Sequence, residues 1–177
     1  LEIAVDDQDH TGEWLRSGAV LAAVTASAQP AAGCNSRPLG AMRYRATASP
    51  DFMRRHFPEG VSAQSLAQAP SLVFNSKDEL QSRWVQRQCR RRVELPRHSL
   101  PSSHAFVAAS LAGLGWGMNP EALVVPHLAR GELVELLPDT PLDVALHWQH
   151  ARAASSLLDR LTGVVLAAAR EALLPLA

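Results

Sequence analysis

Polar side chains gather where the apolar stretches of this sequence end, and their types could bind a charged small molecule. Ser102 and Ser103 stand directly before an Ala-rich helical pattern, and Asn75 and Ser76 follow a short apolar stretch. A helix N-terminus offers free backbone N–H groups beside such hydroxyls, so the two serines suit a carboxylate or a phosphate. The alternative is that both serines only cap the helix, a position that serine favours.

Two more pairs of polar residues follow the first two predicted strands. Asp6 and Asp7 come after an alternating stretch, and Thr25 and Ser27 come at the end of a continuous apolar run. Carboxylates bind cations, whereas hydroxyls and helix N-termini bind carboxylates. Because an amino acid carries both charges, the four pairs predict an amino acid site, and a basic amino acid would use Asp6 or Asp7 best. Taken singly, each residue could instead cap a helix or solvate a loop.

Motifs for covalent catalysis and for nucleotide binding are absent from the sequence. It contains neither the Gly-x-Ser-x-Gly motif of hydrolases nor a Walker A loop. The glycine-rich run at 113–117 follows a helical pattern rather than a strand, so it does not fit a dinucleotide-binding loop. The histidines are scattered, and Cys34 and Cys89 match no metal-ligand spacing. We therefore predict no catalytic residue, no metal site and no cofactor.

The composition fits a folded domain without an overall charge. The 177 residues are 47% hydrophobic and 19% charged, which suffices for a buried core. Lys+Arg and Asp+Glu both number 17, and a formal charge of zero argues against a nucleic-acid clamp. The cysteine usage and the lack of a signal peptide or of an apolar run of ~20 residues predict a cytoplasmic protein that is not in a membrane. Because the sequence begins with Leu1 inside a strand pattern, we expect a fragment of a longer protein.

Arginines cluster near the end of the helix predicted after Ser76, at Arg87, Arg90, Arg91 and Arg92. They could form a phosphate-binding patch, but positive side chains also complement the C-terminal end of a helix dipole. Since no aromatic residues are interleaved with them, we interpret the cluster as a solvated helix end.

The elements that would position these side chains alternate between strand and helix patterns. Strand patterns cover residues 1–5, 19–25, 39–47, 71–75, 116–119, 132–137 and 144–148. Helical patterns follow Thr11, Ser49, Ser62, Ser76, Ser102 and Pro120, and the last one covers 155–173. This order predicts an α/β fold with mainly parallel strands, including a parallel pair formed by the first two.

Two of these helices carry further expectations. Ser76 and Glu79 have the spacing of a capping box, so they are predicted to cap the helix that follows them. The last helix is amphipathic, and its predicted buried face consists of Leu157, Leu158, Leu161, Val164, Val165 and Ala168.

Several motifs are similar to those of a known family. The segments Leu15–Val20, Phe106–Ala109, Ala112–Gly115, Met118–Pro120 and Ala129–Leu136 resemble the effector-binding domain of LysR-type transcriptional regulators. A narrower likeness is to the ArgP/LysG subgroup, which senses lysine and arginine and activates an exporter of basic amino acids. The segments that carry it are Leu1–Glu2, Val5–Asp7, Pro38–Met42, Arg55–Val61, Ser102–Val107 and Leu146–Trp148. Asn119 departs from the Leu that family members commonly carry, and it would either reach the ligand cleft or lie in a turn.

The resemblance implies an α/β fold of two Rossmann-like lobes with a two-strand hinge, like type 2 periplasmic binding proteins, with the effector between the lobes. By analogy, lobe I comprises residues 1–40 and 147–177, and lobe II comprises residues 41–146. The hinge strands are expected near 39–47 and 144–148. The resemblance also implies an N-terminal winged helix-turn-helix, a linker helix and a first strand and helix of lobe I that lie outside this sequence.

The same resemblance implies a role as the effector-sensing and oligomerising part of a DNA-binding regulator. The effector would be lysine or arginine, with Ser102 and Ser103 at its α-carboxylate and Asp6 or Asp7 at a cationic group. The expected partners are DNA, through the N-terminal domain, and further copies in a homodimer or homotetramer. The alternatives are a solute-binding protein of a transporter, which shares the fold, and, with least support, an enzyme on that fold.

Overall fold

The chain forms two compact units in the computed structural model, which describes residues 1–5 and 11–176. Unit 1 comprises Leu1–Arg43 and Asp143–Ala177, and unit 2 comprises Tyr44–Leu142. The chain passes from one unit to the other twice, in β2 (Cys34–Ala48) and in β7 (Leu142–Ala151). These two strands are neighbours in one sheet. That the units act as two lobes around a ligand stays a prediction.

Unit 1 contains a short helix, an edge strand and a long C-terminal helix: α1 (Gly12–Ser17), β1 (Ala22–Thr25) and α7 (Ser155–Ala172). A single 3₁₀ turn, Arg152–Ala154, joins β7 to α7. The strands β1 and β7 are antiparallel, with Thr25 opposite His147. Successive side chains of a strand point to opposite faces, so neighbouring residues of β7 face different helices.

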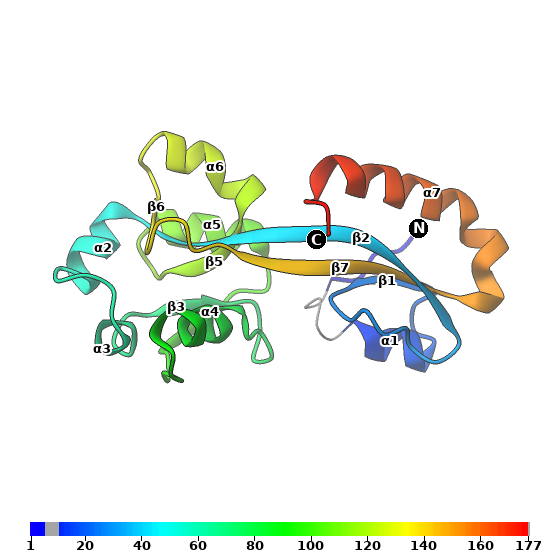
Figure 1. The fold of residues 1–177 in the computed structure, drawn as a ribbon, viewed down its shortest axis with the longest axis horizontal. Coiled ribbons are helices and arrows are strands. Elements are labelled where there is room, and N and C mark those ends of the chain that lie inside the picture. The colour runs from blue at the N-terminus through cyan, green and yellow to red at the C-terminus, as the bar shows by residue number, and fades with distance from the viewer. Residues whose placement is uncertain (6–10, 177) are drawn as a thin grey trace. The chain divides into compact units, whose positions relative to one another are not determined.

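The two faces of the β1–β7 pair are covered by different helices (Figure 1). On one face, the indole N–H of Trp148 donates to Thr162 Oγ1 of α7 at 3.0 Å. On the other face, Gln149 lies beside the pocket that α1 lines. Because a buried indole N–H needs an acceptor, the Trp148–Thr162 bond fixes which side of α7 packs on the sheet.

The C-terminal segment of unit 1 approaches β2 closely at Gly40. Ala41 and Leu174 exchange two backbone hydrogen bonds, of 2.8 and 2.9 Å. Gly40 has φ +139°, and a Cβ there would lie 2.7 Å from the Leu174 carbonyl oxygen. The position therefore requires glycine.

Unit 2 is built around a parallel pair of strands and the end of β2. The strands β3 (Ser71–Val73) and β4 (Arg97–Ser99) are parallel. The strands β5 (Gly117–Pro120) and β6 (Val134–Glu135) each pair antiparallel with β2. The helices of this unit are α2 (Pro50–His56), α3 (Ala63–Leu66), α4 (Leu80–Cys89), α5 (Ser103–Leu111) and α6 (Glu121–Ala129).

Apolar side chains from β3 and α5 form the centre of unit 2. Leu72 is fully buried and packs with Phe106 and Ala109, and the half-buried Phe74 and Leu100 cover that cluster. The backbone N–H of Leu72 also donates to the Trp116 carbonyl at 2.8 Å, which joins β3 to the start of β5. The strand β3 therefore holds both α5 and the start of β5 in place.

Asn119 is a buried polar residue inside unit 2. Its side-chain amide donates to Thr47 Oγ1 at 2.9 Å and to Ser110 Oγ at 3.3 Å. It thus lies in β5 and connects that strand to β2 and α5, rather than in a turn. That it reaches a ligand cleft stays a prediction.

An arginine and two glutamates tie β2 to two other elements of unit 2. Arg45 donates to Glu121 at the start of α6 and to Glu135 of β6, at 2.6 and 2.5 Å. Partial burial lowers the pKa of Arg45, but the hydrogen bonds to the two carboxylates outweigh it and leave that pKa above its ordinary value.

The prediction of mainly parallel strands was wrong for most of the sheet. The pairs β1–β7, β2–β5 and β2–β6 are antiparallel, whereas β3 and β4 are parallel, and Ser71 of β3 also forms a parallel bridge to Trp116. Residues 1–5 form no strand, and Leu1, Ile3 and Val5 are each at least 75% exposed. Alternation predicts which face a strand would bury, but a strand exists only where a partner strand completes its hydrogen bonds.

Two helix predictions also need correction. Ser76 and Glu79 form no capping box, because α4 begins at Leu80 without a side-chain cap. In α7 the buried residues are Leu158, Thr162 and Ala169, whereas Leu157 and Val164 are 74% and 61% exposed. The apolar arc of α7 is wider than the contact surface, and the Trp148 indole selects the side that holds Thr162. Among the residues described, no helix is long and apolar enough to cross a membrane.

The burial of Leu72 leads to a prediction about stability. Leu72→Ala should lower the free energy of unfolding of unit 2 by about 2–5 kcal/mol, because it leaves a cavity in the core. The same substitution at Leu157, which is 74% exposed, is the matched control and should change it by less than about 0.5 kcal/mol. Urea unfolding followed by tryptophan fluorescence measures both, and equal losses would contradict the packing described for Leu72.

Candidate functional site

Four of the predicted site residues follow one edge of the parallel pair in unit 2. Val73, the last residue of β3, lies opposite Ser99, the last residue of β4. The chain after β4 stays bound to β3, because the Leu100 N–H donates to the Val73 carbonyl at 2.9 Å. Asn75 and Ser76 therefore leave the same edge as the segment that carries the two serines at 102 and 103. This edge is where ligands of parallel sheets commonly bind.

The two serines at the start of α5 have different surroundings. Ser102 is the N-cap residue, and its Oγ accepts from the Ala105 N–H at 3.3 Å. Ser103 is the first helical residue and is exposed, and its hydroxyl has no hydrogen-bond partner among the residues that the structure describes. The cap role predicted for a serine here is confirmed for Ser102. The hydroxyl of Ser103 is left available, next to the first N–H groups of a nine-residue helix.

The turn after β3 is organised by an aspartate that is not among the predicted site residues. Asp78 is 4% exposed, and its carboxylate accepts from the Phe74 N–H at 2.8 Å and from the Leu80 N–H at 3.0 Å. Asn75 Oδ1 accepts from the Lys77 N–H at 2.8 Å, which is an Asx-turn. Ser76 is exposed in this turn and does not cap α4. The turn thus presents Asn75 and Ser76 beside the end of β3.

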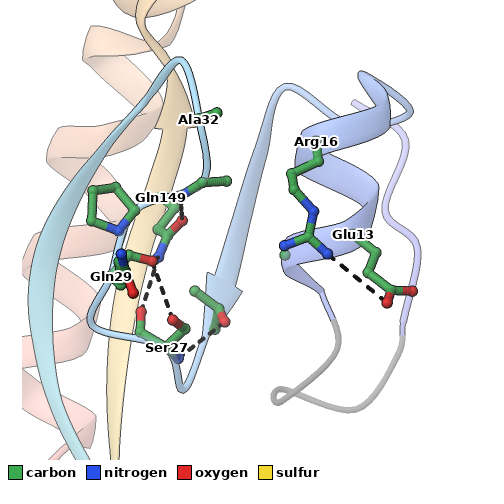
Figure 2. A pocket seen from close by; sticks show the side chains of 10 residues that line it. Glu13, Arg16, Ser27, Gln29, Ala32 and Gln149 are labelled. Carbon is green, nitrogen blue, oxygen red and sulfur yellow. Dashed lines mark hydrogen bonds and ion pairs between the residues drawn. The ribbon is translucent and has the colours of Figure 1, made fainter.

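Unit 1 contains a pocket of about 400 Å³ beside the C-terminal end of β1 (Figure 2). Thr25 is 1% exposed, and its Oγ1 accepts from the Ser27 N–H at 3.2 Å. The Ser27 hydroxyl donates to the Gln29 carbonyl at 3.1 Å. The structure therefore places both of these predicted site residues at one cavity. Its lining is Gly12, Glu13, Arg16, Thr25, Ser27, Gln29, Pro30, Ala31, Ala32 and Gln149.

Gln149 of β7 holds the loop that forms one wall of this pocket. Its Nε2 donates to the carbonyls of Ser27 and Gln29, at 2.9 and 3.0 Å, and its Oε1 accepts from the Ala31 N–H at 2.9 Å. The residue is 1% exposed, so these bonds replace water completely. A buried amide with its donor and acceptor both used fixes the loop in one conformation.

Two side chains of opposite charge come to the pocket from α1. Arg16 and Glu13 lie three residues apart and approach each other to 3.9 Å, and both are more than half exposed. Figure 2 shows them on the helix side of the pocket, across from the loop that Gln149 holds. A long, exposed ion pair is weak, so either charge can turn to a ligand at little cost.

Some residues of this site could be predicted from the sequence, and others could not. The only sequence feature that could have predicted Glu13 and Arg16 is their (i, i+3) spacing on a short helix, which is a weak indication of a site. Gln149 left a stronger one, a polar residue directly after an apolar strand pattern, but its partners lie about 120 residues earlier. Asp6 and Asp7 lie outside the described residues. In the part of the chain that the structure describes, no group of three or more His, Cys, Asp or Glu side chains could hold a metal ion.

Comparison with known proteins gives matches that all point to one protein family. The family described as the LysR substrate-binding domain matches residues 1–170. The HTH-type transcriptional regulator ArgP of Pseudomonas fluorescens Pf-5 is 48% identical over 164 residues, 92% of this chain and 54% of that protein. The chain thus spans about half the length of this curated relative.

Two solved structures are similar along nearly the whole chain. The C-terminal domains of a LysR family protein from Agrobacterium tumefaciens are 56% identical, with a TM-score of 0.94 over 99% of this chain and 84% of that one. Full-length LysG from Corynebacterium glutamicum with bound effector Arg is 38% identical, with a TM-score of 0.83 over 97% of this chain and 59% of that one. The fold of two α/β parts of the type 2 periplasmic-binding-protein kind, predicted from the sequence, is confirmed by these likenesses.

The different surroundings of the two serines lead to a prediction. Ser102→Ala should lower the stability of unit 2 by about 1 kcal/mol, because α5 loses its N-cap. Ser103→Ala, a matched change one residue away, should alter stability by less than about 0.5 kcal/mol. Urea unfolding monitored by circular dichroism measures both. A larger loss for the Ser103 variant would reverse the assignment of the cap.

The bonds of Gln149 lead to a second prediction. Gln149→Ala removes three hydrogen bonds from the loop of unit 1, so its opening should cost about 1–3 kcal/mol less. The Ala31 amide should then exchange its hydrogen about 5- to 150-fold faster. Gln86→Ala, at an exposed glutamine of α4, is the control and should leave the exchange of Ala31 unchanged. Unaltered exchange in the Gln149 variant would show that the loop is held by other contacts.

Proposed function

Because this chain belongs to the LysR substrate-binding domain family, we propose that it is the effector-sensing part of a DNA-binding transcription regulator. The match to residues 1–170 supports this, together with relatives that are named as transcriptional regulators. As the chain spans about half the length of these relatives, DNA binding is assigned to a further domain and regulation to the complete protein. The site of action is the cytoplasm, where such regulators meet DNA.

The effector is a basic amino acid, arginine or lysine. The observation that carries this assignment is the likeness to a LysG described with bound effector Arg, at 38% identity over 97% of this chain. The described residues add chemistry of the right kind in each unit. Unit 2 offers a helix N-terminus with the unpartnered Ser103 hydroxyl, and unit 1 offers the carboxylate of Glu13 at a pocket.

Each unit, taken by itself, offers a group that can bind one of the charged groups of a basic amino acid. The N–H groups and hydroxyl at the start of α5 suit the α-carboxylate, since a helix N-terminus stabilises negative charge. A carboxylate suits the guanidinium or ammonium end through charge-assisted hydrogen bonds. We assign the first role to Ser103, with Ser102 as its positioning cap. The second role goes to Glu13, together with the earlier candidates Asp6 and Asp7.

Effector binding acts on the regulator by shifting a population of conformations. A ligand shifts such an equilibrium only by its difference in affinity for the two states, so the effector must contact groups that differ between them. The complete regulator is proposed to work as a homodimer or homotetramer, which couples the sensing parts to DNA. A solute-binding protein of a transporter is not favoured, because the curated relatives are named as regulators. The same names support a role without catalysis.

The effector assignment is tested by isothermal titration of the full-length protein that carries this chain. Arginine and lysine should bind, while leucine and glutamate should not. Glu13→Gln should weaken arginine binding by about tenfold or more, since a hydrogen bond to a charged group contributes ~1.5–3 kcal/mol. Ser103→Ala should lower the affinity for each bound ligand that has an α-carboxylate by about fivefold.

The matched control is Glu59→Gln, which removes an exposed carboxylate in unit 2 far along the chain from the site residues. It should bind arginine like the wild type. Equal affinity for leucine and arginine would contradict the effector class, and unchanged binding in the Glu13 variant would move the cation role to other carboxylates.

A further inference from the structure

The exposed arginines around the end of α4 form a strongly basic surface on a chain with no net charge. Residues 87–97 contain five arginines and one acidic residue, Glu94, a formal charge of +4, so the other residues of the chain together carry −4. All five arginine side chains are exposed. We name them the arginine patch: Arg87, Arg90, Arg91, Arg92 and Arg97.

The contacts within unit 2 account for only part of this patch. Arg87 donates to the Pro141 carbonyl at 3.4 Å, and Arg97 donates to Ser82 Oγ at 3.3 Å. Arg90, Arg91 and Arg92 follow the last helical residue, Cys89, and have no hydrogen bond or ion pair from their side chains to any residue described.

The helix dipole explains too little of the charge. Its favourable effect falls off within the last turn of the helix. Three consecutive arginines beyond the helix repel one another, and Glu94 is the single acid nearby in the sequence. The unit therefore gains little from this arrangement, and the charges fit an external polyanion better than an internal role.

The chemistry of the patch selects the kind of polyanion. The guanidinium group is planar and binds phosphate through two parallel hydrogen bonds, so arginine is the residue best suited to a phosphate backbone. Proteins that bind single strands stack the bases on exposed aromatic rings. Trp84, the Phe, Tyr or Trp residue nearest to the patch in the sequence, is fully buried and donates to Thr140, so its ring is not available for stacking.

We propose that the arginine patch binds the phosphate backbone of duplex DNA without reading its sequence. The choice of DNA among polyanions rests on the proposed function, because the relatives are named as HTH-type regulators. The zero net charge of the chain does not oppose this binding, since phosphate contacts depend on the local field within about 10 Å at ordinary salt. The patch adds affinity that falls with salt and leaves base recognition to the domain that enters a groove.

The test measures binding of the 177-residue chain to a fluorescent duplex of arbitrary sequence by anisotropy, from about 50 to 200 mM KCl. The triple variant Arg90→Gln, Arg91→Gln, Arg92→Gln should bind at least about tenfold more weakly at the lowest salt. Its slope of log K against log [KCl] should be smaller by about 2–3, because each lost phosphate contact removes close to one unit. Circular dichroism melting verifies that the variant is folded.

The matched control removes three exposed arginines from unit 1: Arg152→Gln, Arg160→Gln and Arg170→Gln. It has the same loss of charge and should keep the wild-type slope. Equal losses in the two triple variants would show a general charge effect and overturn the proposal. So would a wild-type chain that does not bind DNA at the lowest salt, or one that binds polyglutamate as tightly as DNA, which would indicate an acidic protein partner.

The same variants separate this proposal from the effector assignment. The Arg90, Arg91, Arg92 triple variant of the full-length protein should bind arginine as the wild type does. If the wild type binds no basic amino acid but the patch variant still loses DNA affinity, the proposed effector fails and the patch stands. If the wild type binds arginine but the patch variant keeps its DNA affinity, the proposal for the arginine patch fails and the effector assignment stands.

Discussion

The parallel pairing of β3 with β4 is the constraint on which the rest of unit 2 depends. It places Val73 beside Ser99, so the turn at Asn75 and the start of α5 leave one edge of the sheet. The fully buried Leu72 fixes α5 against β3. A helix N-terminus binds anions only if it is held where its N–H groups stay free, and this packing provides that. The chemistry proposed for Ser103 is therefore a consequence of a three-residue ladder.

The features that sequence reading predicted well are those encoded within a few residues. Ser49 and Ser102 cap their helices as expected, because a cap depends on a serine and the N–H three residues later. Asn75 also comes at the end of a strand as predicted, because β3 lies within the strand pattern at 71–75. The same local rule failed at Ser76, where Asp78 takes two backbone N–H groups and leaves α4 to begin later.

The features that could not be predicted depend on pairing between distant segments. The run at 19–25 gives no sign of its partner, and its strand proves to be antiparallel to β7. The role of Gln149 arises only once β7 lies under the loop after β1, although the two are about 120 residues apart in the sequence. Asn119 likewise connects β5 to Thr47, 72 residues away. Such polar contacts are specified by the assembled fold and not by any local pattern.

The net charge of the chain likewise says little about where its charged side chains lie. A formal charge of zero argued against nucleic acid, but it averages Arg90, Arg91 and Arg92 with acids elsewhere in the chain. At ordinary salt, screening limits the field of each charge to about 10 Å. A partner therefore responds to the charges of the patch that it contacts and not to the net charge of the chain. At the pocket of unit 1, Arg16 and Glu13 also cancel in the sum, yet they offer both signs to a ligand. A domain can therefore be neutral, bind a small cation and contact a polyanion, provided that these charges lie on different elements.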